Sequence, residues 1–163
     1  MNREDLHEVI QFVEGDKPIV LVGHSFGGAV ALAFAQRFPD LVAGLVVYES
    51  PMSWEPWWPK DSGGSAAVAI AHDPEEAAET FMRRFIGHRR WEALPEFTRK
   101  QRRSEGAALV VELGDIRRHK PWDLDRVRGP LMAGYGSLSK PHLQASAEQP
   151  GTDWLSPQLY RTC

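Results

Sequence analysis

Two uninterrupted hydrophobic runs flank an apolar helical pattern within the first fifty residues of the chain. The runs cover residues 19–22 and 45–48, and such runs are typical of strands that are buried on both faces of a parallel sheet. Residues 27–37 between them are rich in alanine and other apolar residues, which predicts a buried helix that ends at Phe38-Pro39. Strand, helix and strand at this spacing predict a βαβ unit with two parallel strands and a right-handed crossover.

An amphipathic helix is predicted before the first strand. Its apolar residues Leu6, Val9, Ile10 and Val13 recur with helical spacing within residues 3–14 and therefore share one face.

The pattern changes after residue 50, where prolines and tryptophans predict an irregular loop over residues 51–63. Asp73-Pro74 then predicts a helix start, because aspartate caps a helix and proline fits its first turn. Further helices and one strand follow, with expected ranges of 74–86, 89–103 (broken near Pro95), 104–117 and, for the strand, 127–134. The last residues, 144–163, show weak periodicity and predict no regular element.

Composition limits the possible functions. The chain has 163 residues and a formal net charge of −3, which favours one globular domain and argues against nucleic acid or an anionic membrane as partner. Cys163 is the only cysteine, and the first residues do not resemble a signal peptide, so we expect a cytoplasmic protein. No metal-ligand spacing occurs, and we expect no metal and no cofactor. Arginines between residues 83 and 103 are balanced by glutamates, which predicts a solvated helical face rather than a binding patch.

The strongest chemical signal is the motif Gly23-x-Ser25-x-Gly27, which directly follows the first apolar run and opens the apolar helical pattern. Strand, sharp turn and helix around such a motif hold a nucleophilic serine. Glycine is expected at positions 23 and 27 because the turn brings neighbouring backbone too close for a side chain. The backbone N–H of Phe26 would lie at the helix N-terminus and would stabilise an oxyanion.

Residues 18–50 closely resemble the α/β-hydrolase superfamily around its nucleophile, and the likeness extends more loosely to the rest of the chain. It implies an α/β fold of partial α/β-hydrolase type, with a parallel sheet of about three strands, flanking helices and a helical cap insertion. The implied organisation is a hydrolase core at residues 1–50, a cap at 51–121, a core strand at 122–143 and an irregular tail at 144–163. It also implies that Ser25 is the nucleophile and that Phe26 is an oxyanion donor.

The other members of a catalytic triad depart from the family pattern. In the family a histidine follows the last strand, and His142 is the candidate here. His24 is interpreted as structural, and His7 lies upstream of the motif in a predicted helix. The other three histidines, in the cap-like region, are interpreted as solvated or capping residues: His72, His88 and His119. Ser139 stands where the family usually has its acid. One branch of the family carries the acid after the preceding strand, where this chain has Glu49, and a carboxylate there is costly unless it has a partner.

Two functions stay open from the sequence. The first is a serine hydrolase that acts on a small-molecule ester, lactone or related carbonyl substrate through an acyl-enzyme. Its apolar pocket wall would be formed by Trp54, Trp57, Trp58 and Trp91, and a cap core or a surface patch is the alternative interpretation of these tryptophans. The second is a non-catalytic hydrolase-like remnant or binding module, because the early strands and the usual terminal histidine loop of the family are not visible. We expect that the chain is the middle of a hydrolase from a truncated or frameshifted reading frame. The sequence does not specify an oligomeric state.

Overall fold

The structure is a computed structural model that describes residues 3–149 and 161–162. The chain forms two compact units, residues 1–52 together with 120–163, and residues 53–119. We term the first the sheet unit and the second the helical unit.

The sheet unit is built on parallel strands in the order β1-β2-β3-β4. Their bounds are Ile19–His24 for β1, Val42–Tyr48 for β2, Leu131–Gly136 for β3 and Arg161–Thr162 for β4. The predicted βαβ unit and third strand are confirmed, whereas the two-residue β4 was not predicted. In the register, His24 lies opposite Tyr48 and Tyr48 lies opposite Gly134, so the carboxyl ends of the three longer strands lie side by side.

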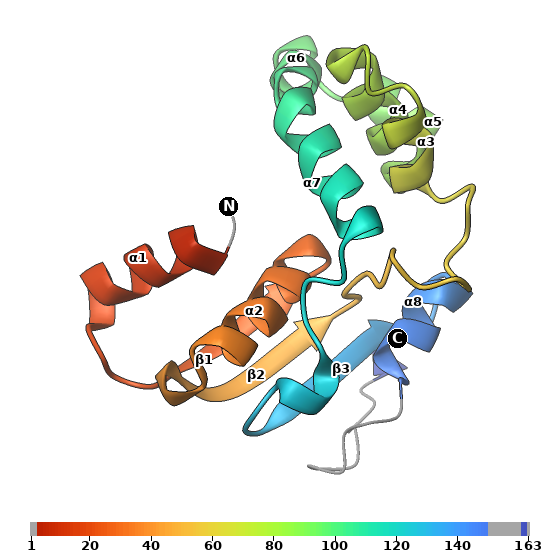
Figure 1. Cartoon of the computed structure of the whole chain (residues 1–163). Helices are drawn as coiled ribbons and strands as arrows, with labels where there is room; N and C mark the ends of the chain where they lie inside the picture. Colours follow the sequence, from red (N-terminus) through yellow and green to blue (C-terminus); the bar gives the residue numbers. More distant parts are fainter. Residues whose placement is uncertain (1–2, 150–160, 163) are drawn as a thin grey trace. The chain divides into compact units, whose positions relative to one another are not determined.

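Two helices pack in succession on one face of β1 and β2 (Figure 1). Helix α2, Phe26–Arg37, contacts both strands, and α1, Arg3–Glu14, packs against α2. Helix α2 is apolar on nearly every side, and Phe34 at its centre is fully buried. The helix ends where Pro39 begins a short 3-10 turn, because the residue before a proline avoids the helical conformation.

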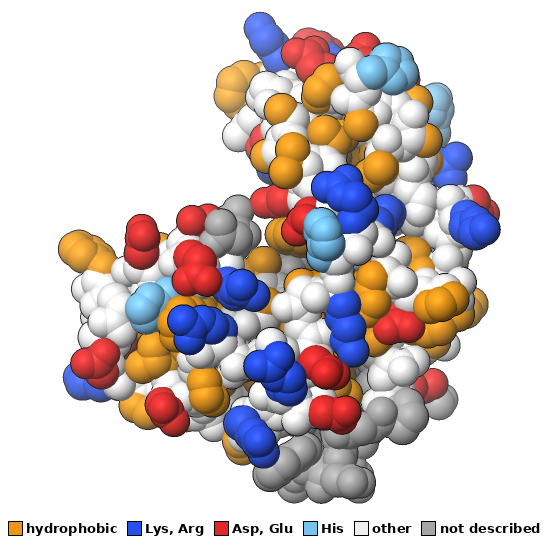
Figure 2. All heavy atoms as spheres, viewed as in Figure 1, with side chains coloured by type: hydrophobic (Ala, Val, Ile, Leu, Met, Phe, Trp, Pro, Cys, Tyr) orange, Lys and Arg blue, Asp and Glu red, His pale blue; other side chains and the backbone are white. Residues whose placement is uncertain are grey.

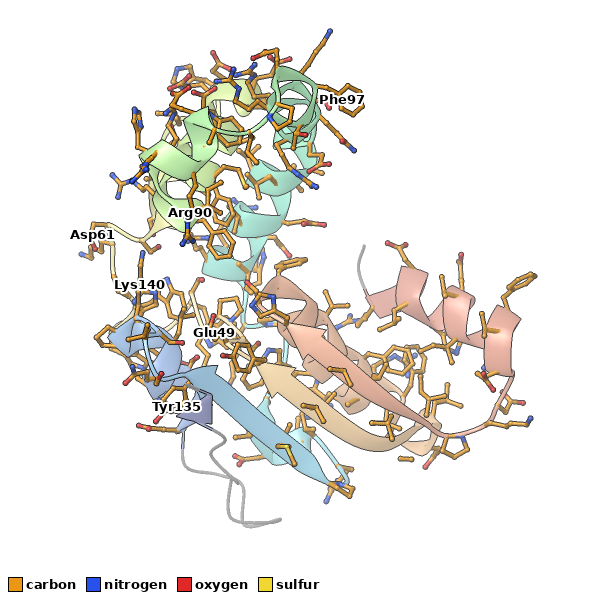
Figure 3. All side chains as sticks on the ribbon, turned by 180° about the vertical axis from the view of Figure 1, so that it is seen from behind. Glu49, Asp61, Arg90, Phe97, Tyr135 and Lys140 are labelled. Atoms are coloured by element: carbon orange, nitrogen blue, oxygen red, sulfur yellow. The ribbon has the colours of Figure 1, made fainter. Side chains whose placement is uncertain are left out.

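The other face of β1 is open among the described residues. Val20 and Val22 point to this face with exposed fractions of 62% and 76%. Figure 3 shows the strands from this side with no described helix crossing β1. Parallel sheets are usually covered on both faces, so this part of the described chain presents an uncovered apolar surface.

Beyond the helical unit, the chain returns through a 3-10 turn at Leu124–Arg126 to β3, and α8, Pro141–Ala147, then packs against β3. The expectation of no regular element after residue 143 is therefore wrong for residues 144–147, which complete α8. Proline at the first position of α8 was the signal that could have identified this helix. Most of the predicted tail, residues 150–160 and 163, lies outside the described residues.

The helical unit contains five described helices, with bounds Gly63–Ala69 (α3), Pro74–Ile86 (α4), His88–Glu92 (α5), Glu96–Ser104 (α6) and Gly106–Arg118 (α7). The predicted start at Asp73-Pro74 is confirmed, and the Asp73 carboxylate accepts a hydrogen bond from Glu76 N at 3.1 Å. The range 89–103 is divided into α5 and α6, with Pro95 directly before α6, and α3 was not predicted.

An ion-pair ring joins α4, α5 and α6. Glu79, Arg83, Glu92, Arg99, Glu96 and Arg103 alternate in sign around it, with N–O distances of 2.5–2.8 Å. Beside the ring, Trp91 is fully buried, and the Arg83 guanidinium lies 6.0 Å from its ring centroid. The glutamates thus balance the arginines through direct ion pairs, and Figure 2 shows both signs of charge over the visible surface.

Acid should destabilise the helical unit through Glu79. Burial of this carboxylate opposes its ionisation, but hydrogen bonds from Arg103 and Arg83 outweigh burial, and the pKa of Glu79 lies below its usual 4.5. As pH falls through about 4.5, the unfolded chain therefore takes up a proton before the folded chain does, and stability is lost. Thermal unfolding of wild type and Glu79→Gln between pH 7 and pH 3 should show a weaker pH dependence in the variant. The matched control is Glu8→Gln on exposed α1, which should keep the wild-type pH dependence.

Candidate active site

Ser25 occupies a strained turn between β1 and α2. Its backbone has φ 52° and ψ −126°, a conformation that a residue with a side chain rarely adopts. Ser25 N donates to the Tyr48 carbonyl oxygen at 2.8 Å, so the turn is anchored to the end of β2. The carbonyl oxygen of Ser25 in turn accepts from Gly28 N at 2.9 Å, which joins the turn to the first turn of α2.

Close backbone packing explains two of the three glycines around Ser25. A Cβ at Gly23 would lie 2.5 Å from the carbonyl oxygen of Gly27, and a Cβ at Gly28 would lie 2.9 Å from Cβ of Ser50. A Cβ at Gly27 would meet no described atom within 4 Å. The described residues therefore account for the small size of Gly23 and Gly28, but give no steric reason for glycine at position 27.

Phe26 is the first residue of α2, directly after Ser25. The first N–H groups of a helix lack acceptors within the helix, and the helix dipole adds partial positive charge at that end. This position suits the backbone N–H of Phe26 for an anion that forms next to the serine.

Glu49 directly follows β2, as Ser25 directly follows the neighbouring strand β1. It directly follows Tyr48, the register partner of His24, and its label in Figure 3 lies at the tip of β2. With φ 51°, Glu49 and Ser25 are the two non-glycine residues with positive φ among the described residues. Glu49 N donates to the Gly134 carbonyl oxygen at 2.9 Å, which holds this strained residue beside β3. Backbone strain at two adjacent strand ends is typical of a functional site.

The Glu49 carboxylate is largely buried and has several partners. Its side chain is 18% exposed. The Ser139 hydroxyl donates to Glu49 Oε1, Gly136 N lies 3.4 Å from the same oxygen, and His24 Nε2 lies 3.8 Å from Oε2. The partners needed for a carboxylate at this position are therefore present, and one of them is the serine at the position where the family usually has its acid.

His142 is the second residue of α8 and is half-buried. Ser139 precedes it by three residues, so their Cα atoms lie at most about 11 Å apart. Within residues 3–149, no hydrogen bond joins the Ser25 hydroxyl to His142 or to any other histidine. The structure thus connects Glu49 to the turn that precedes His142, but does not bring His142 into hydrogen-bond contact with Ser25.

The remaining histidines lie in other surroundings. His7 stacks on Phe38 with ring centroids 4.2 Å apart, while His72, His88 and His119 lie exposed on the helical unit. His88 hydrogen-bonds Arg83, and His119 Nδ1 lies 2.8 Å from Asp115 Oδ1. His24, at the elbow, contacts Glu49 and Tyr48.

A mostly apolar pocket with a cavity volume of about 40 Å³ opens beside Glu49 within the sheet unit. Its lining includes Leu32, Trp122 and Leu131, with Glu49 and Ser50 as polar groups. Ser50 is 8% exposed, and its hydroxyl has no hydrogen-bond partner among the described residues. Trp122, which our sequence interpretation overlooked, belongs to this lining because the chain returns to the sheet unit at that point.

The expected tryptophan wall is only partly compatible with the structure. Trp91 is fully buried, so it belongs to the core of the helical unit and cannot line an open pocket there. Trp57 is 40% exposed, whereas Trp58 is 9% exposed. The large volume of Trp91 suits a helix core as well as a ligand wall, and sequence alone did not distinguish the two.

A family model described as "Alpha/beta hydrolase family" matches residues 1–161. The match covers nearly the whole chain and agrees with the nucleophile elbow and parallel sheet described above. The chain therefore belongs to the alpha/beta hydrolase family.

Solved structures share the fold. An alpha/beta hydrolase named MGS-M2, from a Medee basin deep-sea metagenome library, is similar over 98% of this chain and 62% of its own, with TM-score 0.63 and 16% identity. A thermophilic esterase from Thermogutta terrifontis is similar over 88% of this chain and 57% of its own, with TM-score 0.58 and 25% identity. The chain thus spans about 60% of the length of these structures.

Curated relatives match shorter segments. Lipase LipV of Mycobacterium tuberculosis is 58% identical over 36 residues, which are 22% of this chain and 14% of the lipase. Proline iminopeptidase of Saccharolobus solfataricus is 41% identical over 58 residues, 36% of this chain and 18% of the relative. These matches cover less than a fifth of either relative, so they do not assign an activity to this chain.

No described helix is both long and apolar enough to cross a membrane. No described group of three or more histidine, cysteine, aspartate or glutamate side chains is arranged to hold a metal ion.

The two motif glycines should respond differently to alanine. Gly23→Ala should destabilise the sheet unit by about 1–3 kcal/mol or more, because the new methyl group would overlap backbone that cannot move aside easily. Gly27→Ala, in the same motif, should change stability by less than about 1 kcal/mol, because its methyl group meets open space. Urea unfolding of the two variants checks this, and equal losses would show that the packing at Gly23 is not as described.

Proposed function

We propose that this chain carries the nucleophile and the acid of a serine hydrolase that acts on a small-molecule ester, lactone or related carbonyl substrate. The observation that carries the proposal is the pair of strained residues, Ser25 and Glu49, at the adjacent carboxyl ends of β1 and β2. Strain of this kind is costly in stability and is typical of sites where chemistry sets the geometry.

In the proposed reaction, Ser25 Oγ attacks the substrate carbonyl carbon and its proton passes to a histidine base, for which His142 is the candidate. The negative oxygen of the tetrahedral intermediate accepts a hydrogen bond from Phe26 N. The carbon–oxygen bond to the leaving alcohol then breaks, the alcohol takes the proton, and an acyl-enzyme ester on Ser25 remains. Water then attacks the acyl-enzyme ester with the help of the same base, and the substrate's carboxylic acid leaves as the Ser25 hydroxyl is restored. Glu49 orients the base and stabilises its charged form.

A small apolar substrate group suits the pocket beside Glu49. The pocket is lined mainly by apolar side chains, with Glu49 and Ser50 as polar groups, and this kind of lining is typical of small-molecule sites. Similar proteins include a lipase and an esterase, which favours the same class of substrate. The helical unit, residues 53–119, would correspond to the cap of the family, and Trp57 is one of its exposed aromatic residues.

A non-catalytic binding module is the second candidate. The specific observation that favours it is the lack of a hydrogen bond between the Ser25 hydroxyl and a histidine among the described residues. A serine without a base is a poor nucleophile at neutral pH. The same elbow and pocket would then bind a carbonyl compound without converting it.

Removal of the nucleophile separates the two functions. Ser25→Ala should lower kcat/KM for p-nitrophenyl acetate at least about 100-fold, and should abolish covalent labelling by a fluorophosphonate probe, because both need the Ser25 oxygen. The control, Ser104→Ala, removes an exposed hydroxyl in the helical unit and should keep both properties. Equal hydrolysis rates and no labelling in wild type would reject the enzyme and leave the binding module.

Removal of the candidate base tests His142 separately. His142→Ala should lower kcat about 10²–10⁴-fold, the usual contribution of a general base, with a smaller change in KM. The exposed His72→Ala in the helical unit is the matched control and should keep the wild-type rate. Full activity of His142→Ala, together with inactivity of Ser25→Ala, would retain the hydrolase and exclude His142 as its base.

A further inference from the structure

Ser139 lies in a turn that is held rigidly at the end of β3. Ser139 N donates to the Gly136 carbonyl oxygen at 3.0 Å, and Gly136 N donates to Ser139 Oγ at 2.8 Å, so the turn is closed by two reciprocal hydrogen bonds. The carbonyl oxygen of Ser139 also accepts a hydrogen bond from Gln144 Nε2 at 2.7 Å, which ties the turn to α8. The Ser139 hydroxyl therefore has a defined position before any contact with Glu49.

The hydrogen bond from Gly136 also sets the direction of the hydroxyl proton. A serine hydroxyl has one proton to donate and two lone pairs to accept with. Because Gly136 N–H already occupies one lone pair of Ser139 Oγ, the proton is free to point to Glu49 Oε1, to which Ser139 donates. Gly136 N, 3.4 Å from the same oxygen, adds positive potential there.

Close packing at Gly136 makes this arrangement possible. A Cβ at this position would lie 2.9 Å from the Tyr48 hydroxyl oxygen, 3.1 Å from Ser139 Oγ and 3.7 Å from Glu49 Oε1. Only a residue without a side chain leaves the hydroxyl and the carboxylate in contact across the ends of β2 and β3. Glu49 Oε2 is then directed away from Ser139, on the side of His24 at 3.8 Å.

We propose that Ser139 is a positioning residue, whose hydroxyl fixes the Glu49 carboxylate in the orientation that the acid of this site requires. The proposal rests on the proposed function in one respect, namely that Glu49 is that acid. It assigns a role to the serine at the position where the family usually has its acid: this serine cannot orient a histidine directly, but it orients the carboxylate that the neighbouring strand supplies. A hydrogen bond to a charged group in a largely buried site is among the stronger contacts in proteins.

A double-mutant cycle tests the contact without reference to activity. In urea unfolding, Ser139→Ala should raise the unfolding constant about tenfold when Glu49 is present, and less than about twofold in the Glu49→Ala background. Ser139→Thr keeps the hydroxyl and should stay near wild type, whereas Ser104→Ala should cost equally little with and without Glu49. Losses from Ser139→Ala that are the same in both backgrounds would overturn the proposal.

Kinetics test the consequence for the site. For p-nitrophenyl acetate, Ser139→Ala should lower kcat about tenfold with KM nearly unchanged, Ser139→Thr should restore most of the rate, and Ser139→Ala should have no further effect in Glu49→Ala. A drop that persists in Glu49→Ala, or that threonine does not rescue, would overturn the proposal.

Failure of the proposed hydrolase function and failure of the Ser139 proposal give different experimental results. If wild type and Ser25→Ala hydrolyse the ester equally, the proposed function fails and with it the catalytic meaning of Glu49, so the positioning role is overturned as well. If Ser25→Ala is inactive and the cycle shows no coupling, the hydrolase stands and the role of Ser139 alone is rejected.

Discussion

The hydrogen bond from Ser25 N to the Tyr48 carbonyl oxygen is the constraint on which the site depends. It extends the contact between β1 and β2 one residue beyond the strands, so the chain must turn into α2 at that point. The turn forces Ser25 into positive φ and brings the carbonyl oxygen of Gly27 to 2.5 Å from where a Cβ of Gly23 would be. The strain is balanced by the burial of α2, whose apolar side chains cover β1 and β2.

The buried carboxylate of Glu49 is the second constraint. A charge in a largely buried position is unfavourable unless neighbouring groups donate to it. The chain meets this need with a turn from a different strand, since Ser139 and Gly136 come from the end of β3. Parallel strands make this possible because their carboxyl ends meet at one edge of the sheet, where ligands of open α/β sheets usually bind.

The helical unit is held together by a different balance of forces. A fully buried Trp91 supplies apolar contact, and the alternating ion-pair ring beside it matches the charges of α4, α5 and α6. Individual exposed ion pairs contribute little, but a closed network fixes several long side chains together. These contacts lie within residues 53–119 and hold this unit together independently of the sheet unit.

The sequence by itself determined the local elements of this protein, among them the sharp turn at Ser25 between β1 and α2. Hydrophobic period and helix-start residues identified β1, α2 and α4, because these signals arise from neighbouring residues along the chain. The sequence also predicted the break near Pro95, but it did not determine α3 or α8, because these short helices carry too few residues for a clear period. Only the tertiary structure decided that Ser139 contacts Glu49, 90 residues apart, and that Trp91 is a core residue. The physical reason is that strand order and register set such contacts, and neither can be read from a local pattern.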